Sequence, residues 1–223
     1  MNAKKRHSFL YRNSLSIVVI TLMLVFWAAQ AYTGWKEYNK ELAEYHQEAI
    51  GLGQYLTSGH FLQSTFENWE SEFLQMALFV WLTIFLFQKG SSESKKFDGT
   101  DKVDRKPDKR RKNVPGPVKT GGLALKLYEH SLTLVLLLLF AVSTILHFRG
   151  SLADENKIRA LRGKPLEDAW DYLASSRFWF ESFQNWQSEF LAVASIVLLS
   201  IWLRQKGSPE SKPVDASYNE TGG

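Results

Sequence analysis

The chain contains no cysteine, so it has no disulfide bond, no thiolate ligand for a metal ion and no cysteine nucleophile. It also lacks the local signatures of common enzymes: there is no Gly-x-Ser-x-Gly, no His-Glu-x-x-His and no phosphate-binding glycine loop. Its five histidines are scattered, and no two stand at the spacing that metal ligands on one helix need. We therefore expect a protein that is not an enzyme and that has no cofactor and no metal ion.

Charged residues are absent from four apolar blocks, at residues 15–31, 73–87, 132–148 and 190–203. A helix that crosses about 30 Å of hydrocarbon needs about 20 mostly apolar residues. Each block is slightly shorter, and aromatic residues beside the blocks favour the membrane interface and can complete the span. The alternative, four buried helices of a soluble bundle, would show polar stripes at helical spacing, and residues 134–142 show none. The sequence predicts an all-α integral membrane protein with four transmembrane helices.

The charges outside the blocks predict which side of the membrane each segment occupies. Residues 1–13 carry four basic residues and no acid, and residues 88–126 hold twelve Lys or Arg against five Asp or Glu. Residues 33–70 have two lysines against six glutamates. Positively charged loops stay in the cytoplasm. We expect both termini and the central linker to be cytoplasmic, with residues 33–70 and 149–188 on the other side.

The first apolar block has an alternative interpretation as a secretory signal peptide. A basic start, an apolar run and Ala29-Gln30-Ala31 match the pattern that signal peptidase cleaves. An equivalent segment later in the chain, ending at His147 and Phe148, cannot be a signal peptide. We therefore expect the first block to stay attached as a transmembrane helix.

An internal repeat with a constant offset runs through the chain. The segment 66–74 (Phe-Glu-Asn-Trp-Glu-Ser-Glu-Phe-Leu) recurs at 183–191 as Phe-Gln-Asn-Trp-Gln-Ser-Glu-Phe-Leu, so that Trp69 and Trp186 are 117 positions apart. The same offset pairs residues 10–11, 14–15, 55–56, 88–91 and 93–95 with identical residues later in the chain. A shared offset without gaps indicates a duplicated unit of two spans. Both copies should therefore have the same orientation, around an axis along the membrane normal.

These features divide the chain into five segments. We expect a cytoplasmic N-terminus at 1–13, a first transmembrane hairpin unit at 14–87, a flexible basic linker at 88–126, a second hairpin unit at 127–204 and a disordered tail at 205–223. The basic run 106–112 fits a solvated cytoplasmic loop better than a lipid or nucleic-acid site. The expected partner is the lipid bilayer, with a second copy of the chain or another membrane protein possible, and no nucleic acid.

Outside the membrane, apolar residues recur every three or four positions at Trp35, Tyr38, Leu42 and Tyr45. This spacing predicts a helix at about 36–48 that lies on the membrane surface. Glycines at 51 and 53 should end it, and Gly163-Lys164-Pro165 forms the corresponding break in the second unit.

The repeated Asn-Trp-x-Ser-Glu-Phe-Leu motif, together with the segment 55–62 (Tyr-Leu-Thr-Ser-Gly-His-Phe-Leu), resembles a family of uncharacterised bacterial membrane proteins. The resemblance covers both hairpin units and implies a bacterial inner membrane. It implies no activity for any residue. The second unit departs from the pattern, because Ser175-Ser176-Arg177 stands where the first unit has Ser58-Gly59-His60.

Two glutamates, Glu72 and Glu189, are the strongest candidates for a polar or ion site. Each is expected near the outer edge of the hydrocarbon, where an ionised group is costly unless it is paired. Asn68 and Asn185 stand four residues earlier, on the same helix face. The further polar candidates are His60 and Arg177, and the expected interface anchors are Trp69, Trp186 and Trp35.

From these residues we expect a non-enzymatic protein with a structural, accessory or partner-binding role. The alternative is an ion or proton pathway lined by Glu72 and Glu189, and an intramembrane hydrolase using the same pair is the remaining enzymatic possibility.

Overall fold

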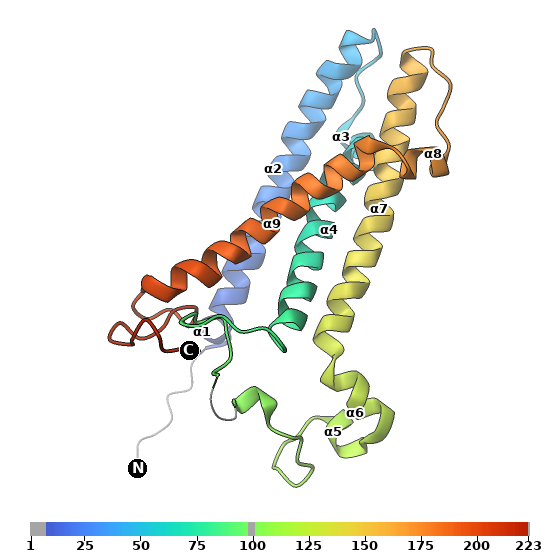
Figure 1. Ribbon diagram of the computed structural model, residues 1–223. Helices are drawn as coiled ribbons and strands as arrows, with labels where there is room; N and C mark the ends of the chain where they lie inside the picture. The colour runs from blue at the N-terminus through green and yellow to red at the C-terminus, as the bar shows by residue number, and fades with distance from the viewer. Residues whose placement is uncertain (1–7, 98–100, 223) are drawn as a thin grey trace. The chain divides into compact units, whose positions relative to one another are not determined.

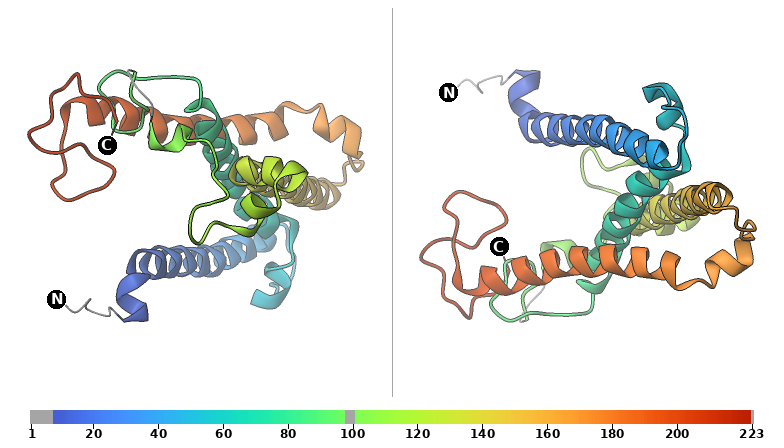
Figure 2. Two further views of the ribbon diagram at one scale, coloured as in Figure 1. Left: turned by 90° about the horizontal axis from the view of Figure 1, so that it is seen from below. Right: turned by 90° about the horizontal axis from the view of Figure 1, so that it is seen from above.

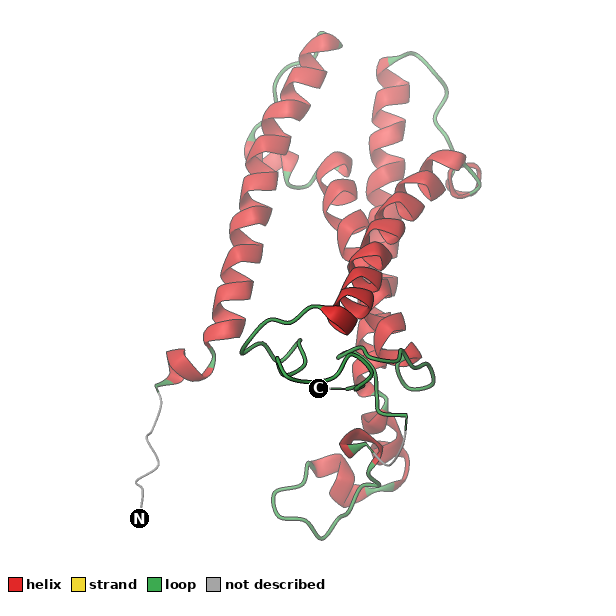
Figure 3. Cartoon of the chain, turned by 60° about the vertical axis from the view of Figure 1, so that its left-hand side comes forward, coloured by secondary structure: helices red, strands yellow, loops and turns green. Residues whose placement is uncertain are grey.

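The computed structural model describes residues 8–97 and 101–222. Every regular element among these residues is a helix (Figure 3), which confirms the predicted all-α class. Residues 1–7, which belong to the predicted cytoplasmic N-terminus, residues 98–100 of the predicted linker, and residue 223 of the predicted tail lie outside the described residues.

Four long helices alternate with short ones along the chain (Figure 1). The elements are α1 (Phe9–Arg12), α2 (Ser14–Glu44), α3 (Leu52–Tyr55), α4 (Gly59–Leu82), η1 (Lys102–Asp104), α5 (Gly116–Thr120), α6 (Gly122–Glu129), α7 (Ser131–Leu161), α8 (Ala169–Leu173) and α9 (Ser176–Trp202). The predicted linker at 88–126 thus contains η1, α5 and the start of α6.

Two of the described helices, α2 and α7, are long and apolar enough to cross a membrane. Each has 31 residues, and their most apolar windows have mean hydropathies of 2.0 and 2.3. Only 6% and 17% of these windows are buried within the protein, whereas the core helix of a soluble protein is mostly buried. The helices α4 and α9 do not meet the same criterion, because acids and amides occupy their first halves. The count of four spans therefore stays a prediction.

The boundaries of two helices differ from those that the sequence suggested. Helix α2 continues without a break to Glu44, so the expected surface helix at 36–48 is the extension of the apolar block and not a separate element. Helix α4 ends at Leu82, five residues before the end of its apolar block. There the Thr83 hydroxyl donates to the Val80 carbonyl. The N–H groups of Ile84 and Phe85 then bond to carbonyls three residues back, not four as in an α-helix, and the chain turns.

Several local features recur at the offset of 117 residues. The starts of α2 and α7, of α3 and α8, and of α4 and α9 are all separated by this number. Asn39 accepts a hydrogen bond from the N–H of Ile50 at 2.8 Å and donates one to its carbonyl at 3.1 Å. Asn156 makes the same two bonds with Glu167, at 2.7 and 3.0 Å. In both places one asparagine ties the chain that leaves a long helix back onto that helix.

The chain divides into two compact units, which we describe separately. The first comprises Met1–Gln63 and Arg149–Glu167. Its core consists of Tyr38, Leu42, Tyr55 and Phe61, all buried. Tyr55 packs against Gly34 of α2, where a β-carbon would collide with the tyrosine hydroxyl. The first unit is thus held by aromatic packing on the second half of α2.

The second unit comprises Ser64–Phe148 and Asp168–Gly223. It contains most of α4, the first part of α7, and the whole of α8 and α9, which can be followed in two further views in Figure 2. At the end of this unit that the sequence predicts to be cytoplasmic, the hydroxyl groups of Ser91 and Ser200 are hydrogen-bonded at 3.0 Å. The Lys212 ammonium is 2% exposed and donates to three backbone carbonyls of the segment 217–220. These bonds organise part of the tail at 205–223.

Two glycines permit a close approach of helices inside the first unit. A β-carbon at Gly150 of α7 would lie 2.6 Å from the backbone nitrogen of Gln63, and one at Gly59 would lie 2.6 Å from the carbonyl oxygen of Gly150. Such distances are too short for any side chain. Small residues at helix contacts of this kind let backbones pack closely.

We predict that Gly150→Ala destabilises the protein by about 1–3 kcal/mol, because the backbone must shift to admit the methyl group. The measurement is unfolding of the purified protein in detergent micelles. The control is Gly53→Ala in α3, where nothing lies within 4 Å of the added carbon. The control should be neutral or more stable, since alanine favours a helix over glycine. Equal stabilities of the two variants would contradict the close packing at Gly150.

Candidate functional site

A histidine with no exposed surface lies near the end of the apolar block of α7. His147 stands four residues after Ser143 and four before Ser151, and all three are buried. The buried face of this part of α7 is therefore polar, although the helix contains an 18-residue window with a mean hydropathy of 2.3. A buried imidazole needs hydrogen-bond partners, because an unpaired polar group is costly in an apolar environment.

One nitrogen of His147 is paired with Glu70 of α4. The distance from His147 Nδ1 to Glu70 Oε2 is 2.8 Å, and both side chains are almost completely buried. The other carboxylate oxygen, Oε1, accepts a hydrogen bond of 3.0 Å from Nε1–H of Trp186 in α9. An indole nitrogen only donates, so Glu70 acts as the acceptor for both neighbours. We assign the histidine proton to Nδ1 on this basis.

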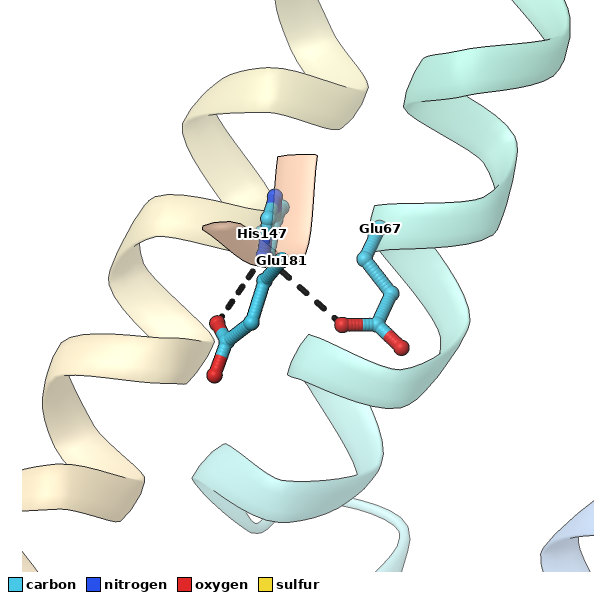
Figure 4. Close-up of side chains that lie close together, drawn as sticks. All are labelled: Glu67, His147 and Glu181. Carbon is cyan, nitrogen blue, oxygen red and sulfur yellow. Dashed lines mark ion pairs between the residues drawn. The ribbon is translucent and has the colours of Figure 1, made fainter. Parts of the chain in front are cut away.

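The other nitrogen of His147 faces two more carboxylates. His147 Nε2 lies 3.9 Å from Glu67 Oε2 and 3.7 Å from Glu181 Oε2, both beyond hydrogen-bond distance. Figure 4 shows that the two glutamate side chains point toward the histidine from α4 and α9. Nε2 is buried and has no hydrogen-bond partner within the part of the chain that the structure describes. With the proton on Nδ1, the lone pair of Nε2 is directed at the two carboxylates.

The two outer glutamates are less buried than the inner pair. The side chains of Glu67 and Glu181 are 21% and 16% exposed, compared with 1% for Glu70. Arg177 lies one turn before Glu181 and donates from Nε to its Oε1 at 3.0 Å. The cluster thus has a closed inner side, formed by Glu70 and Trp186, and an outer side that solvent reaches.

Chemically, the cluster offers three ligand atoms to a cation. The imidazole nitrogen of His147 and one oxygen each from Glu67 and Glu181 lie within 4.8 Å of one another. Neutral imidazole and carboxylates are the nitrogen and oxygen ligands that divalent metal ions use in proteins. The sequence predicted no metal site, since its histidines are scattered and it has no cysteine. It could not reveal this cluster, because the three residues come from three different helices.

The predicted pair Glu72 and Glu189 is brought together by α4 and α9. The two carboxyl groups are close enough to interact. Two adjacent carboxylates repel each other unless a proton or a cation is shared between them. The structure therefore contains a second acidic centre, at the residues that the sequence singled out.

The other predicted polar residues have different partners. The side-chain amides of Asn68 and Asn185 donate one turn back, to the carbonyls of Ser64 and Glu181, and not forward to the glutamates. His60 belongs to the first unit, where its Nδ1 lies 3.1 Å from the hydroxyl of Tyr55. Of these polar residues, Arg177 binds a side chain of the cluster around His147, and Asn185 donates to the backbone carbonyl of Glu181.

The three predicted anchor tryptophans lie in three environments. Trp186 donates to Glu70, as described above. Trp35 donates from Nε1 to the carbonyl of Ile50 at 2.7 Å and packs on the core of the first unit. Trp69 packs edge-on against Phe66, with ring centroids 5.3 Å apart. Trp186 and Trp35 thus donate hydrogen bonds within the protein, which a tryptophan serving only as an interface anchor does not need to do.

Sequence reasoning missed Glu67, Glu70 and Glu181 as site residues. A signal was present in the differences between the two copies of the repeat. At the offset of 117, Glu67 and Glu70 correspond to Gln184 and Gln187, and His147 corresponds to Gln30. At each of these three positions, one copy has an ionisable residue and the other copy has a glutamine.

This helical chain with a buried polar cluster belongs to a family described as Domain of unknown function (DUF6766), whose match covers residues 6–223. No curated protein and no solved structure matches the chain.

We predict that Glu70→Leu destabilises the protein by about 3–5 kcal/mol, because His147 and Trp186 lose their shared acceptor inside the protein. Unfolding in detergent micelles measures the change. The matched control is Gln187→Leu, at the corresponding position of the second copy, where the side chain is exposed. The control should change stability by no more than about 0.5 kcal/mol. A Glu70→Leu variant as stable as the control would show that the buried network is dispensable.

Proposed function

We propose that the protein is a non-enzymatic integral membrane protein with four transmembrane helices, arranged as two tandem hairpin units of the same orientation. Its role is structural or accessory, and its partners are the lipid bilayer and a second copy of the chain or another membrane protein. The proposed location is a bacterial inner membrane, with both termini in the cytoplasm.

The observation that carries this proposal is that, along the apolar blocks of α2 and α7, many large apolar side chains are exposed, while polar side chains of α7 are buried. On α7, Ser143 and His147 are 2% and 0% exposed, whereas Leu138 is 63% exposed. The exposed large hydrophobic residues of α2 form a continuous series from Leu22 to Phe26. A water-soluble protein avoids such a surface, since exposed apolar patches promote association. Lipid tails favour it.

The local similarities at the offset of 117 residues support the repeat. Equivalent helices begin at equivalent positions, and the asparagine ties at Asn39 and Asn156 have the same two hydrogen bonds. Gly90 and Gly207 share a φ of +86°. The proposal extends this likeness to α4 and α9, which would span the membrane although acidic residues up to Glu72 and Glu189 lower the hydropathy of these helices.

The structural role is supported by the way in which the buried polar groups are used. Glu70 bonds to His147 of α7 and to Trp186 of α9, so one carboxylate links three helices. Hydrogen bonds and close packing hold helices together in lipid, where apolar contacts between helices give no advantage over contacts with lipid tails. A network of this kind holds a fixed arrangement and is suited to a scaffold.

The alternative function, an ion or proton pathway, is favoured by one specific observation. Glu72 and Glu189, from different helices, lie near enough for the charge of one carboxyl group to affect the other. Acidic residues at membrane depth commonly take part in proton or cation transfer. We rank this second because the cluster around Glu70 is closed by hydrogen bonds on its inner side.

The proposed topology predicts the labelling of single cysteines introduced into this naturally cysteine-free chain. Cysteines at positions 47 and 157 should react with a membrane-impermeant reagent added to intact cells. Cysteines at positions 104 and 218 should react only after the membrane is permeabilised. Labelling of position 104 in intact cells would overturn the proposed orientation.

The structural role predicts that the parent protein carries no proton or cation flux in liposomes, and that Glu72→Gln and Glu189→Gln fold normally. Glutamine keeps the size and much of the hydrogen bonding of glutamate, but it cannot exchange a proton at physiological pH. Flux is measured with an entrapped pH-sensitive dye, with Glu44→Gln at the exposed end of α2 as the control. If the parent and Glu44→Gln carried a flux that Glu72→Gln and Glu189→Gln had lost, the protein would be an ion or proton pathway and not a structural protein.

A further inference from the structure

We propose that His147, Glu67 and Glu181 form a binding site for one divalent transition-metal ion. The inference goes beyond the proposed function and does not depend on the number of spans. It begins from Nε2 of His147, which is buried and without a hydrogen-bond partner among the described residues. A buried acceptor that faces only other acceptors is unfavourable, and a cation between them removes the conflict.

The geometry of the three ligand atoms fits a metal ion. Ligands about 2.0–2.1 Å from a tetrahedral ion are about 3.4 Å from each other. The observed distances from Nε2 are 3.7 Å to Glu181 Oε2 and 3.9 Å to Glu67 Oε2. A movement of a few tenths of an ångström, well within the freedom of two partly exposed glutamates, completes the site. A water molecule on the exposed side supplies the fourth ligand.

The orientation of the histidine is already that of a metal ligand. Metal-bound histidines commonly donate their second ring N–H to a carboxylate, which fixes the ring and the tautomer. Glu70 accepts from Nδ1–H of His147 in this way, and Trp186 holds Glu70 through its other oxygen. Glu70 is therefore a positioning residue, which acts on the ion through His147.

The charges of the cluster also call for a divalent cation. Glu67, Glu70 and Glu181 are three acids, and Arg177 is the basic residue bonded to one of them. With His147 neutral, one divalent ion together with Arg177 balances the three carboxylates. In a region of low dielectric constant such a balance removes the large cost of uncompensated charge.

The ligand types indicate which ions the site takes. Magnesium and calcium prefer sites made of oxygen ligands, whereas imidazole favours zinc and its neighbours in the first transition series. The absence of cysteine excludes the thiolate sites that zinc and copper(I) also use. We therefore infer a preference for Zn²⁺, Mn²⁺, Fe²⁺ or Co²⁺ over Mg²⁺ and Ca²⁺.

The test uses the full chain in detergent micelles, freed of metal by a chelator and then titrated with Zn²⁺ alone. Metal analysis after dialysis should find one ion per chain, and an excess of Mg²⁺ should not displace it. Glu67→Gln and Glu181→Gln should each lower the Zn²⁺ affinity more than about 100-fold, and Glu70→Gln about 10–100-fold. The control Glu129→Gln removes an exposed carboxylate of the same unit and should bind as the parent does.

Two further measurements separate loss of the site from loss of the fold. Zn²⁺ should raise the unfolding temperature of the parent and of Glu129→Gln, but not that of Glu67→Gln or Glu181→Gln. The circular dichroism spectra of the last two variants should match the spectrum of the parent, which shows that their helices are intact. Co²⁺ bound to the parent should give the intense visible absorption of a four-coordinate ion, and Glu70→Gln should alter this spectrum.

A parent protein that takes up no Zn²⁺ or Co²⁺ after chelation would overturn the proposal. So would Zn²⁺ affinities for Glu67→Gln and Glu181→Gln equal to that of the control, since the ion would then be bound elsewhere.

Discussion

A carboxylate buried among helices needs a hydrogen-bond donor for each of its oxygens, and Glu70 is such a carboxylate in this protein. His147 satisfies one oxygen and Trp186 the other, so α4, α7 and α9 are tied at a single point of the second unit. The same bonds set the direction of the imidazole ring. Once Nδ1 is engaged with Glu70, Nε2 has to face Glu67 and Glu181. The polar chemistry of the unit therefore follows from one buried pair.

The distribution of side chains over the long helices reverses that of a water-soluble bundle. On α7, Ser143, His147 and Ser151 are buried, whereas most leucines in its first half, such as Leu134, Leu137 and Leu138, are exposed. Glycines also allow helices to pack closely, since at Gly59 and Gly150 the backbones approach too closely for a side chain. Contacts between leucines do not draw helices together in lipid, so close packing and hydrogen bonds must do so. In the proposed membrane location, the exposed leucines and the buried glycines both follow from lipid being the solvent.

Much of the fold could be predicted from the sequence, because helix formation depends on local pattern. Each of the four long helices contains most or all of one apolar block. Ser175, in the second unit, accepts a hydrogen bond at the start of α9 as a helix cap should. The end of α4 could not be predicted, since the sequence stays apolar to Phe87 while the backbone hydrogen bonding changes near Thr83. Hydropathy reports solvent preference and not hydrogen-bond geometry.

The candidate site could be predicted only in part, because it is made by contacts between helices. Glu72 and Glu189 were identified because each stands directly before an apolar block, at the expected edge of the hydrocarbon, and no other helix is needed to see this. His147 lies in a block with no neighbour in sequence that explains it. Its partner Glu70 lies 77 residues earlier in the sequence, on another helix. Periodicity within one helix cannot reveal such a pairing.

Comparison of the two copies separates the residues that serve the fold from those that serve a site. Asn39 and Asn156 occupy equivalent positions and make equivalent bonds, as expected for a tie that any such hairpin needs. Glu70 and its counterpart Gln187 differ in charge, and Gln187 is exposed. A glutamine in place of Glu70 would suffice to bond an indole N–H, so the bonding of Trp186 alone does not require a carboxylate. The charge at residue 70, together with those at 67 and 181, is explained by a neighbour that carries positive charge, and His147 with a bound cation is such a neighbour.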